Sequence, residues 1–381
     1  MRQTASFIST YAADVSGVCS ALYELGGMTV MHDASGCNST YNTHDEPRWY
    51  DMDSLVFISA VSENDAIMGD DEKLIRDICE TASALHPRFV AVAGTPIPML
   101  IGTDFTAVAA AVERRTGIPA MGIPTNGMHS YVQGAGLAFE ALAGRFVRED
   151  LRPVPGERRV NLLGLTPLDF GVNGSDADIA GLLEDAGWQV VSRWAMGSTL
   201  DDLTRAGEAN VNLVVSAAGL PTARRLRQRF GTPFAAGVPV GEAFSRQVLQ
   251  ALETALRTGE DQFPCAQRGD GAPKLAVIGE SVGAGSLAAA VTAEYGVPVR
   301  LICPLETEAV LLGQGDCRAL DEDELVPALA EVPAVAADPL YRPICGDRDF
   351  FDLPSYGFSG RIWKRGIPNL IGKPLKERNQ L

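Results

Sequence analysis

Residues 27–37 are Gly27-Met28-Thr29-Val30-Met31-His32-Asp33-Ala34-Ser35-Gly36-Cys37, an apolar stretch that leads into a Gly-Cys pair. The apolar part predicts a strand, and the pair predicts a tight turn at its end. Gly36 has no side chain, so the backbone beside Cys37 can approach a bulky inorganic cluster without a clash. We therefore expect Gly36 to lie against a cofactor and the thiolate of Cys37 to bind a metal.

A second cysteine, Cys19, precedes this strand and lies in the helical pattern of residues 19–26. An iron–sulfur cluster is usually held by four cysteine thiolates, and Cys19 and Cys37 are only two. A second chain has to supply the rest, which predicts a [4Fe–4S] cluster at a subunit interface. In a homodimer two symmetric pairs complete the set, and a paralogous partner with three cysteines is the alternative. Cys19 can also pack as a small apolar residue, and the sequence leaves that alternative open.

The composition excludes several classes of function. The 381-residue chain has 46% hydrophobic and 21% charged residues, as globular proteins do. Its net charge of −16 argues against a nucleic-acid-binding surface. The N-terminal residues lack the apolar core of a signal peptide, and no apolar run approaches the roughly 20 residues of a membrane helix. With seven cysteines, an odd number unlike a secreted disulfide framework, we expect a cytoplasmic protein without nucleic-acid or membrane partners.

Short apolar runs alternate with amphipathic stretches along the chain. The apolar runs lie at 55–58, 89–93, 160–164, 211–215 and 275–279, and amphipathic stretches lie at 107–115, 177–186 and 243–257. This alternation predicts parallel sheets buried between helices. In each third of the chain, at 117–119, 231–233 and 296–298, a helical pattern ends at Gly-x-Pro before the next strand. We therefore expect an α/β protein with three Rossmann-like parallel-sheet units.

Dense proline, glycine and charged residues at 152–158 and 267–273 mark the predicted boundaries. We expect an N-terminal cluster-binding domain at 1–152, a second α/β domain at 153–268, and a third at 269–381 with a C-terminal return segment. All four histidines lie in the first domain, together with Cys19 and Cys37. We therefore expect the metal-binding and proton-donating residues to lie mainly in the first domain.

Five segments, taken in order, resemble nitrogenase component 1 and its relatives. They are residues 32–37, 62–69, 93–104, 122–129 and 356–360. The resemblance is strongest over residues 15–145 and weaker beyond them. In size, the chain is most similar to the reductive cyclase of nickel-tetrapyrrole synthesis and to protochlorophyllide reductase. The resemblance implies three domains of the nitrogenase component 1 type.

Three positions depart from the family pattern. Pro96 stands where the family has a third cluster cysteine, and proline cannot bind a metal. Ala223 and Tyr356 stand where the family has the two ligands of its catalytic cofactor. The resemblance implies that Pro96 lies beside the cluster and shields it. It also implies that this chain alone holds no nitrogenase-type catalytic cofactor.

The resemblance implies a catalytic-component subunit of an ATP-dependent reductase. A separate ATP-hydrolysing iron–sulfur protein would deliver single electrons to the interface cluster, which would relay them to a small-molecule or tetrapyrrole substrate. His44 and His129 are the candidates for proton donors, with an exposed or packed histidine as the alternative for each. The alternative function is a non-catalytic partner subunit or a scaffold for metallocofactor assembly.

Overall fold

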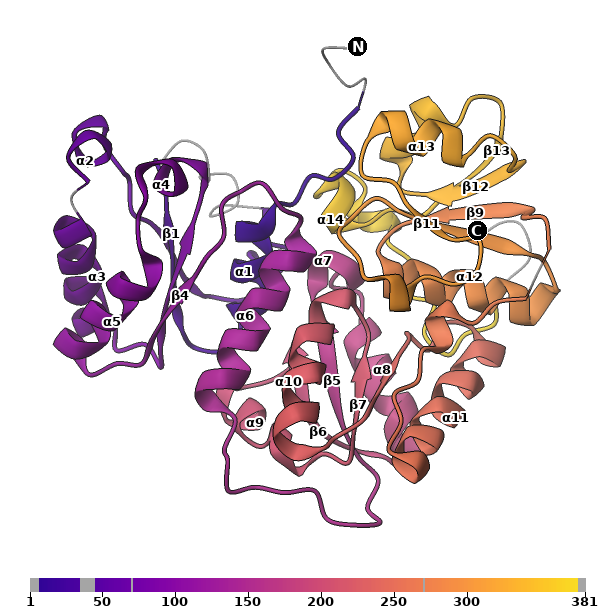
Figure 1. The fold of residues 1–381 in the computed structure, drawn as a ribbon, viewed down its shortest axis with the longest axis horizontal. Helices are drawn as coiled ribbons and strands as arrows, with labels where there is room; N and C mark the ends of the chain where they lie inside the picture. Colours follow the sequence, from indigo (N-terminus) through magenta and orange to yellow (C-terminus); the bar gives the residue numbers. More distant parts are fainter. Residues whose placement is uncertain (1–6, 35–44, 70, 270, 376–381) are drawn as a thin grey trace.

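The computed structural model describes residues 7–34, 45–69, 71–269 and 271–375, which form three parallel β-sheets flanked by helices (Figure 1). The strand order is β2-β1-β3-β4 in the first sheet, β6-β5-β7-β8 in the second and β11-β10-β9-β12-β13 in the third. The predicted α/β fold with three parallel sheets is confirmed.

The strands are β1 (Met28–His32), β2 (Leu55–Ile58), β3 (Val90–Gly94), β4 (Ala120–Ile123), β5 (Arg159–Leu165), β6 (Gln189–Ala195), β7 (Val211–Val214), β8 (Phe234–Ala236), β9 (Leu275–Ile278), β10 (Val299–Cys303), β11 (Cys317–Arg318), β12 (Ala334–Ala337) and β13 (Asp349–Asp352). The α-helices are α1 (Asp14–Leu22), α2 (Glu63–Met68), α3 (Asp71–Leu85), α4 (Pro96–Ile101), α5 (Phe105–Thr116), α6 (Tyr131–Phe146), α7 (Pro167–Phe170), α8 (Ser175–Asp185), α9 (Leu200–Thr204), α10 (Leu220–Phe230), α11 (Glu242–Thr258), α12 (Ser281–Tyr295), α13 (Glu322–Ala328) and α14 (Tyr356–Ser359). Short 3-10 turns include η6 (Pro339–Ile344) and η7 (Lys364–Gly366).

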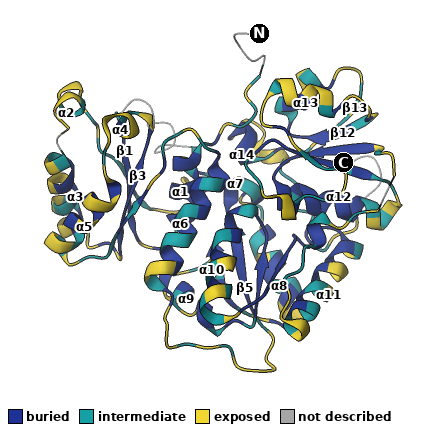
Figure 2. Ribbon diagram, viewed as in Figure 1, coloured by how far each residue is buried: buried dark blue, intermediate teal, exposed yellow. Residues whose placement is uncertain are grey.

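The two central strands of the first sheet, β1 and β3, are buried on both faces, as their unbroken apolar runs predict (Figure 2). On β3, Val90 and Val92 pack in one apolar cluster with residues of α3 and α5. The alternate residues Ala91 and Ala93 belong to the cluster that contains α1 and α6. This alternation follows from the two-residue period of a strand, and it places α1 between the first sheet and the rest of the molecule.

The predicted helix endings are confirmed at all three Gly-x-Pro positions. Gly117, Gly231 and Gly296 follow the last residues of α5, α10 and α12 with φ of 71°, 75° and 65°. These left-handed values suit glycine, and the proline two residues later prevents the helix from continuing. Strands β4, β8 and β10 begin directly after these prolines.

The predicted extent of the first helix was wrong. The pattern of residues 19–26 indicated a helix there, but α1 begins at Asp14 and ends at Leu22. The carboxylate of Asp14 accepts hydrogen bonds from the backbone N–H groups of Val15, Asn126 and Gly127, at 2.7, 2.9 and 2.9 Å. An acidic first turn favours a helix start at this point. The tertiary contact with Asn126 and Gly127 is not visible in the local sequence.

The C-terminal segment returns from the third sheet to the second unit. Ile371 forms an antiparallel bridge with Val240, and the side chains of Asn369 and Lys373 donate to Asp178 on α8 at 2.8 and 3.0 Å. The three sheets lie within the ranges 1–152, 153–268 and 269–381, which we retain as proposed domains. No helix in the described ranges is both long enough and apolar enough to cross a membrane.

Candidate functional site

The carboxyl ends of β1, β3 and β4 converge at one edge of the first sheet. The register pairs His32 with Gly94, so these strands end at the same level. The hydroxyl of Thr95 donates to the carboxylate of Asp33 at 2.7 Å and to the carbonyl of His32 at 3.1 Å. The hydroxyl of Thr125, after β4, donates to the carbonyl of Gly94 at 2.8 Å. In open α/β sheets this is the edge at which ligands bind.

Pro96 is the first residue of α4 and is exposed at this edge. Its missing N–H is no loss at the first helical position. Its ring lies beside Gly127, where an added Cβ would come within 2.6 Å of the proline Cδ and where φ is +73°. A side chain at position 127 would therefore collide with the Pro96 ring. The ring occupies this edge as an apolar group that can cover a cofactor but not bind a metal.

Three predicted site residues, Gly36, Cys37 and His44, lie outside the described residues. Asp33, four positions before Cys37, is fixed by its hydrogen bond with Thr95. The roles of Gly36 and Cys37 stay predictions.

Cys19 lies on α1 and its side chain is completely buried. It belongs to the apolar cluster formed with α6. Burial raises the pKa of the thiol well above its usual value, so Cys19 is held as a neutral thiol. Metals bind the thiolate. This environment favours a packing role, and metal binding by Cys19 remains a prediction.

The two described histidines near this edge differ in environment. His32 is buried, its Nδ1 lies 2.8 Å from the hydroxyl of Ser59, and burial lowers its pKa to about 4. Its imidazole is therefore neutral near neutral pH. The side chain of His129 is 40% exposed and its Nδ1 lies 3.3 Å from the carboxylate of Glu306 in the third unit. The side chain of His129 is therefore accessible to solvent, and its role as a proton donor stays a prediction.

The described residues do not by themselves form an iron–sulfur site. They contain no cluster of three or more His, Cys, Asp or Glu side chains arranged to hold a metal ion. Pro96 cannot ligate, and Cys19 points into the core. A four-thiolate cluster at this edge therefore depends on Cys37 and on a partner chain.

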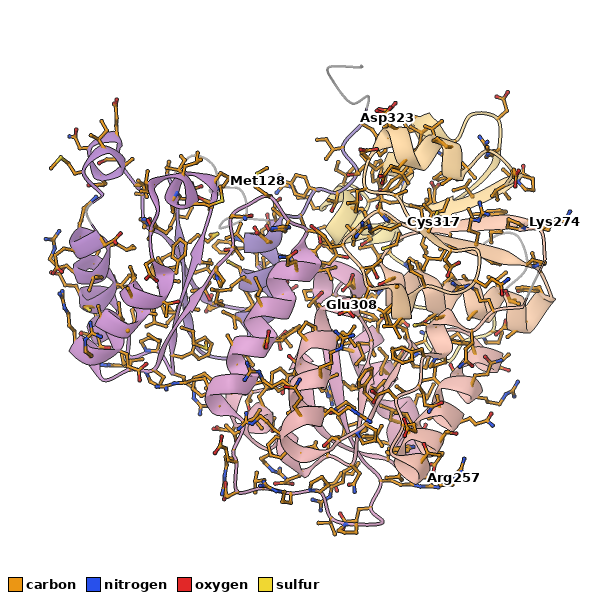
Figure 3. All side chains as sticks on the ribbon, in the orientation of Figure 1. Met128, Arg257, Lys274, Glu308, Cys317 and Asp323 are labelled. Atoms are coloured by element: carbon orange, nitrogen blue, oxygen red, sulfur yellow. The ribbon has the colours of Figure 1, made fainter. Side chains whose placement is uncertain are left out.

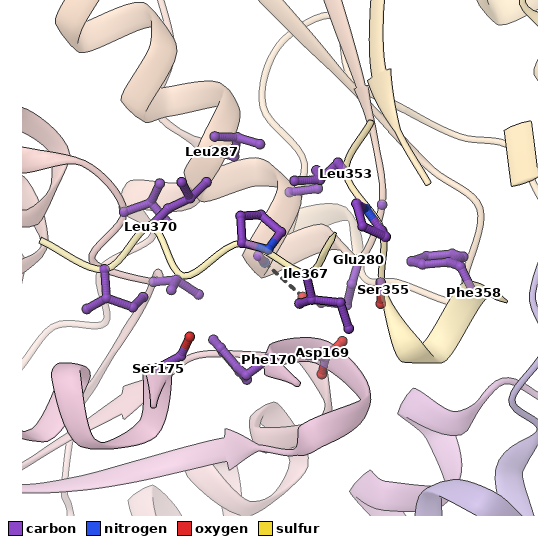
Figure 4. A pocket seen from close by; sticks show the side chains of 18 of the residues that line it. Asp169, Phe170, Ser175, Glu280, Leu287, Leu353, Ser355, Phe358, Ile367 and Leu370 are labelled. Atoms are coloured by element: carbon purple, nitrogen blue, oxygen red, sulfur yellow. Dashed lines mark hydrogen bonds between the residues drawn. The ribbon is translucent and has the colours of Figure 1, made fainter. Parts of the chain in front are cut away.

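A second candidate site is a cavity of about 130 Å³ between the second and third units (Figure 4). Most of its lining is apolar, including Phe170, Leu287, Leu353 and Ile367. Its polar groups include the carboxyls of Asp169 and Glu280 and the hydroxyls of Ser175 and Ser355. An apolar cavity with a few convergent polar groups is the usual form of a small-molecule site.

Asp169 is the titratable centre of this cavity. Its Oδ1 accepts a hydrogen bond from the hydroxyl of Tyr131 at 2.5 Å, and Thr166 donates to its Oδ2 at 3.3 Å. Burial and, next, the negative charge of Glu280 raise the pKa of Asp169 to about 7. Near neutral pH this carboxyl therefore exists in both protonation states, and the protonated form can donate a hydrogen bond to a bound molecule.

Glu280 is fixed by three backbone hydrogen bonds. Its carboxylate caps the N-terminus of α12 by accepting from the N–H groups of Val282 and Gly283, at 3.0 and 2.8 Å. It also accepts from the N–H of Ala217, at 3.0 Å. Burial raises its pKa, while these N–H groups oppose the shift. Two carboxyls in one apolar cavity cannot both ionise easily, so the pair favours the state in which only one of them is ionised.

The sequence did not identify these two acids. Glu280 lies in the short turn that connects β9 to α12. A usable signal was present, since Asp169 follows β5 and Glu280 follows β9 at the carboxyl ends of parallel strands. What the sequence could not show is that the two ends face one cavity. Ala223, which stands where the family has a cofactor ligand, lies inside α10 and is fully buried.

Comparisons with known proteins identify related chains. The family described as "Nitrogenase component 1 type Oxidoreductase" matches residues 17–357. The nitrogenase iron-molybdenum cofactor biosynthesis protein NifE of Klebsiella pneumoniae is 26% identical over 248 residues, which cover 61% of this chain and 53% of that protein. The NifE protein of Rhodobacter capsulatus is 30% identical over 203 residues, covering 51% and 41%.

The nitrogenase molybdenum-iron protein alpha chain of Methanosarcina barkeri is 22% identical over 195 residues, covering 50% of this chain and 36% of that protein. The matched region thus spans about half or less of these relatives. A solved structure described as "Nitrogenase Cp1 at pH 6.5" superposes with a TM-score of 0.70 at 14% identity. It covers 98% of this chain and 92% of that chain, and this likeness concerns the fold.

Proposed function

We propose that this chain is one subunit of a nitrogenase-like, ATP-dependent reductase. The premise is that the chain belongs to the nitrogenase component 1 type oxidoreductase family. In this proposal the edge of the first sheet holds a [4Fe–4S] cluster together with a partner chain. The observation that carries the proposal is the hydrogen bond from Thr95 to Asp33, which joins the start of α4 to the chain that leads to Cys37. When bound, the cluster would accept and release single electrons.

Exposed apolar side chains at the same edge support contact with a second chain. Ile67 and Met68 at the end of α2 are 73% and 78% exposed, and Leu100 on the adjacent α4 is 78% exposed. Met128, in the loop after β4, is 71% exposed and is labelled in Figure 3. Several exposed apolar groups along one edge favour a protein interface there. A homodimer or a paralogous partner would both cover them.

In the proposed reductase, the cavity between the second and third units receives the substrate. The apolar walls exclude water, and Ser175 and Ser355 can orient a polar group of the ligand. The protonated Asp169 can donate its proton, because its pKa lies near neutrality. Tyr131 keeps the carboxyl in place through its hydroxyl. A separate ATP-hydrolysing iron–sulfur protein belongs to the proposal as the electron donor.

A second candidate function is a scaffold for metallocofactor assembly. It is supported by the relatives whose printed names describe iron-molybdenum cofactor biosynthesis. The two functions differ in what leaves the protein. A reductase releases a reduced small molecule and keeps its cluster through many turnovers, whereas a scaffold transfers its iron–sulfur cargo to an acceptor protein.

Anaerobic purification with iron and sulfide analysis and EPR tests the cluster. A homodimer should contain about four irons per dimer, and Cys37→Ala should lose them. Cys79→Ala, at a half-buried thiol on α3, is the matched control and should retain its iron. Unchanged iron in Cys37→Ala, a cluster retained on a dilute monomer, or iron lost from the Cys79 variant would refute this arrangement.

The variant Cys19→Ala decides the role of Cys19. Loss of iron at unchanged stability would assign Cys19 as a ligand, as the sequence predicts. Retained iron with a lower unfolding free energy would assign it to the core, as its burial favours. Molybdenum or vanadium bound stoichiometrically to the isolated chain would contradict the proposal that it holds no catalytic metallocofactor alone.

A further inference from the structure

A groove of about 960 Å³ lies on the third unit, outside the sites described above. It is formed by η6, the residue that ends β13 and the turn that contains η7. Its lining includes four cations and one acid, in a chain whose net charge is −16. The groove is therefore a local positive region on an acidic protein. Pro354 lines both this groove and the cavity that contains Asp169.

Only one of the four cations is neutralised within the groove. Arg342 forms an ion pair with Asp352 at 2.6 Å, and its guanidinium also lies over the ring of Phe350 at 4.4 Å. Arg361, Lys364 and Arg365 form no ion pair with any residue in the described ranges. Three like charges on one short turn repel one another, and a bound anion relieves that repulsion.

An indole lies among these cations. Trp363 is 37% exposed and stands between Arg361 and Lys364 in the turn, while its neighbour Ile362 is 70% exposed. The ammonium of Lys364 lies 5.6 Å from the ring of Tyr50. Three prolines form the remaining walls and stiffen them. Aromatic faces beside Arg and Lys bind flat rings by stacking and hold their charged groups by ion pairs.

We propose that this groove binds a flat aromatic anion, with Arg361, Lys364 and Arg365 holding the anionic groups and Trp363 contacting the ring. A nucleoside phosphate and an aromatic polycarboxylate share this chemistry. The proposal does not depend on the cluster or on the cavity, since it uses none of their charged residues.

To test the groove, each probe is titrated into the full-length protein, and binding is measured by calorimetry and by tryptophan fluorescence. The probes are ATP, benzene-1,3,5-tricarboxylate and the fluorescent trisulfonate pyranine, with inorganic phosphate as the anion without a ring. We expect at least one aromatic anion to bind more tightly than phosphate. Tighter binding of ATP would identify the ligand as a nucleoside phosphate, and tighter binding of the tricarboxylate would identify it as an aromatic polycarboxylate. No binding of any aromatic probe up to about 1 mM would overturn the proposal.

A charge-matched pair of variants separates the groove from general electrostatics. The double variant Lys364→Gln/Arg365→Gln should bind the probe about tenfold more weakly. Arg257→Gln/Lys274→Gln removes the same charge at two exposed positions far from the groove in Figure 3 and should leave the affinity unchanged. Equal loss in both variants would overturn the proposal. Trp363→Leu should weaken the binding of the aromatic probes but not the binding of phosphate. If the wild-type protein binds phosphate and the aromatic probes with equal affinity, the ligand is not an aromatic anion and the proposal is overturned.

Discussion

Asp169→Asn should change how the stability of the second unit depends on pH. The folded protein raises the pKa of this carboxyl from 3.8 to about 7, so the folded state binds a proton that the unfolded state releases. Stability contributed by the protonated form is therefore present below the unfolded pKa and is lost as pH rises towards 7. At about 1.4 kcal/mol per pKa unit, the wild type loses roughly 2–3 kcal/mol between about pH 5 and about pH 8.

The asparagine variant lacks this titration, so its unfolding free energy should vary less with pH. Relative to the wild type, it should gain about 2–3 kcal/mol between about pH 5 and about pH 8. Urea unfolding followed by tryptophan fluorescence measures this gain, because Trp194 is fully buried in β6 of the same unit. The control is Asp178→Asn, an acid whose pKa is lowered by Lys373 and which should show no gain at high pH. Equal pH profiles for wild type and Asp169→Asn would refute the assignment of a protonated Asp169.

Three further predictions concern the first unit. Gly134→Ala should lower the free energy of unfolding by about 1–3 kcal/mol in urea denaturation, because the added Cβ would overlap the backbone of Asp14 on α1. The control is Gly181→Ala on α8, where the added Cβ meets open space; it should be neutral or stabilising in the same assay. Asp14→Ala should cost about 2–4 kcal/mol, since it removes the acceptor of three backbone N–H groups, and thermal unfolding at the wild-type midpoint would contradict this. His32 should remain neutral down to about pH 5, because burial lowers its pKa to about 4. The free energy of unfolding should therefore fall as pH drops from 6.5 towards 4. An NMR titration of His32 with a midpoint near pH 6.5 would contradict the buried imidazole.

Local patterns were sufficient to predict much of the fold. The run 55–58 is strand β2 without change, and the Gly-x-Pro phrases end α5, α10 and α12 as expected. These features depend on backbone preferences that neighbouring residues determine. The start of α1 was missed because it depends on the contact of Asp14 with a loop that is distant in sequence.

The candidate sites were less predictable for the same reason. Pro96 was expected beside the cluster loop, and its neighbour Thr95 does bond to Asp33, while the position of Cys37 itself remains a prediction. The cavity acids come from different units, and Tyr131, which orients one of them, comes from α6. No local pattern encodes which strand ends will share a cavity. Burial, which decides both the pKa of Asp169 and the state of Cys19, is a tertiary property.

The return of the C-terminal segment has a mechanical consequence for the cavity. The chain passes from the second unit to the third near residue 268 and comes back at Leu370–Gly372, whose backbone bonds to Gly241 and Pro239 at 3.0 and 2.9 Å. The third unit is thus attached to the second at two places, by the covalent connection near residue 268 and by the hydrogen-bonded return segment. A body held by two hinges can turn only about the line that joins them. Any widening of the cavity should therefore be a single rotation about that line, and cutting the returning segment would release the other directions of motion.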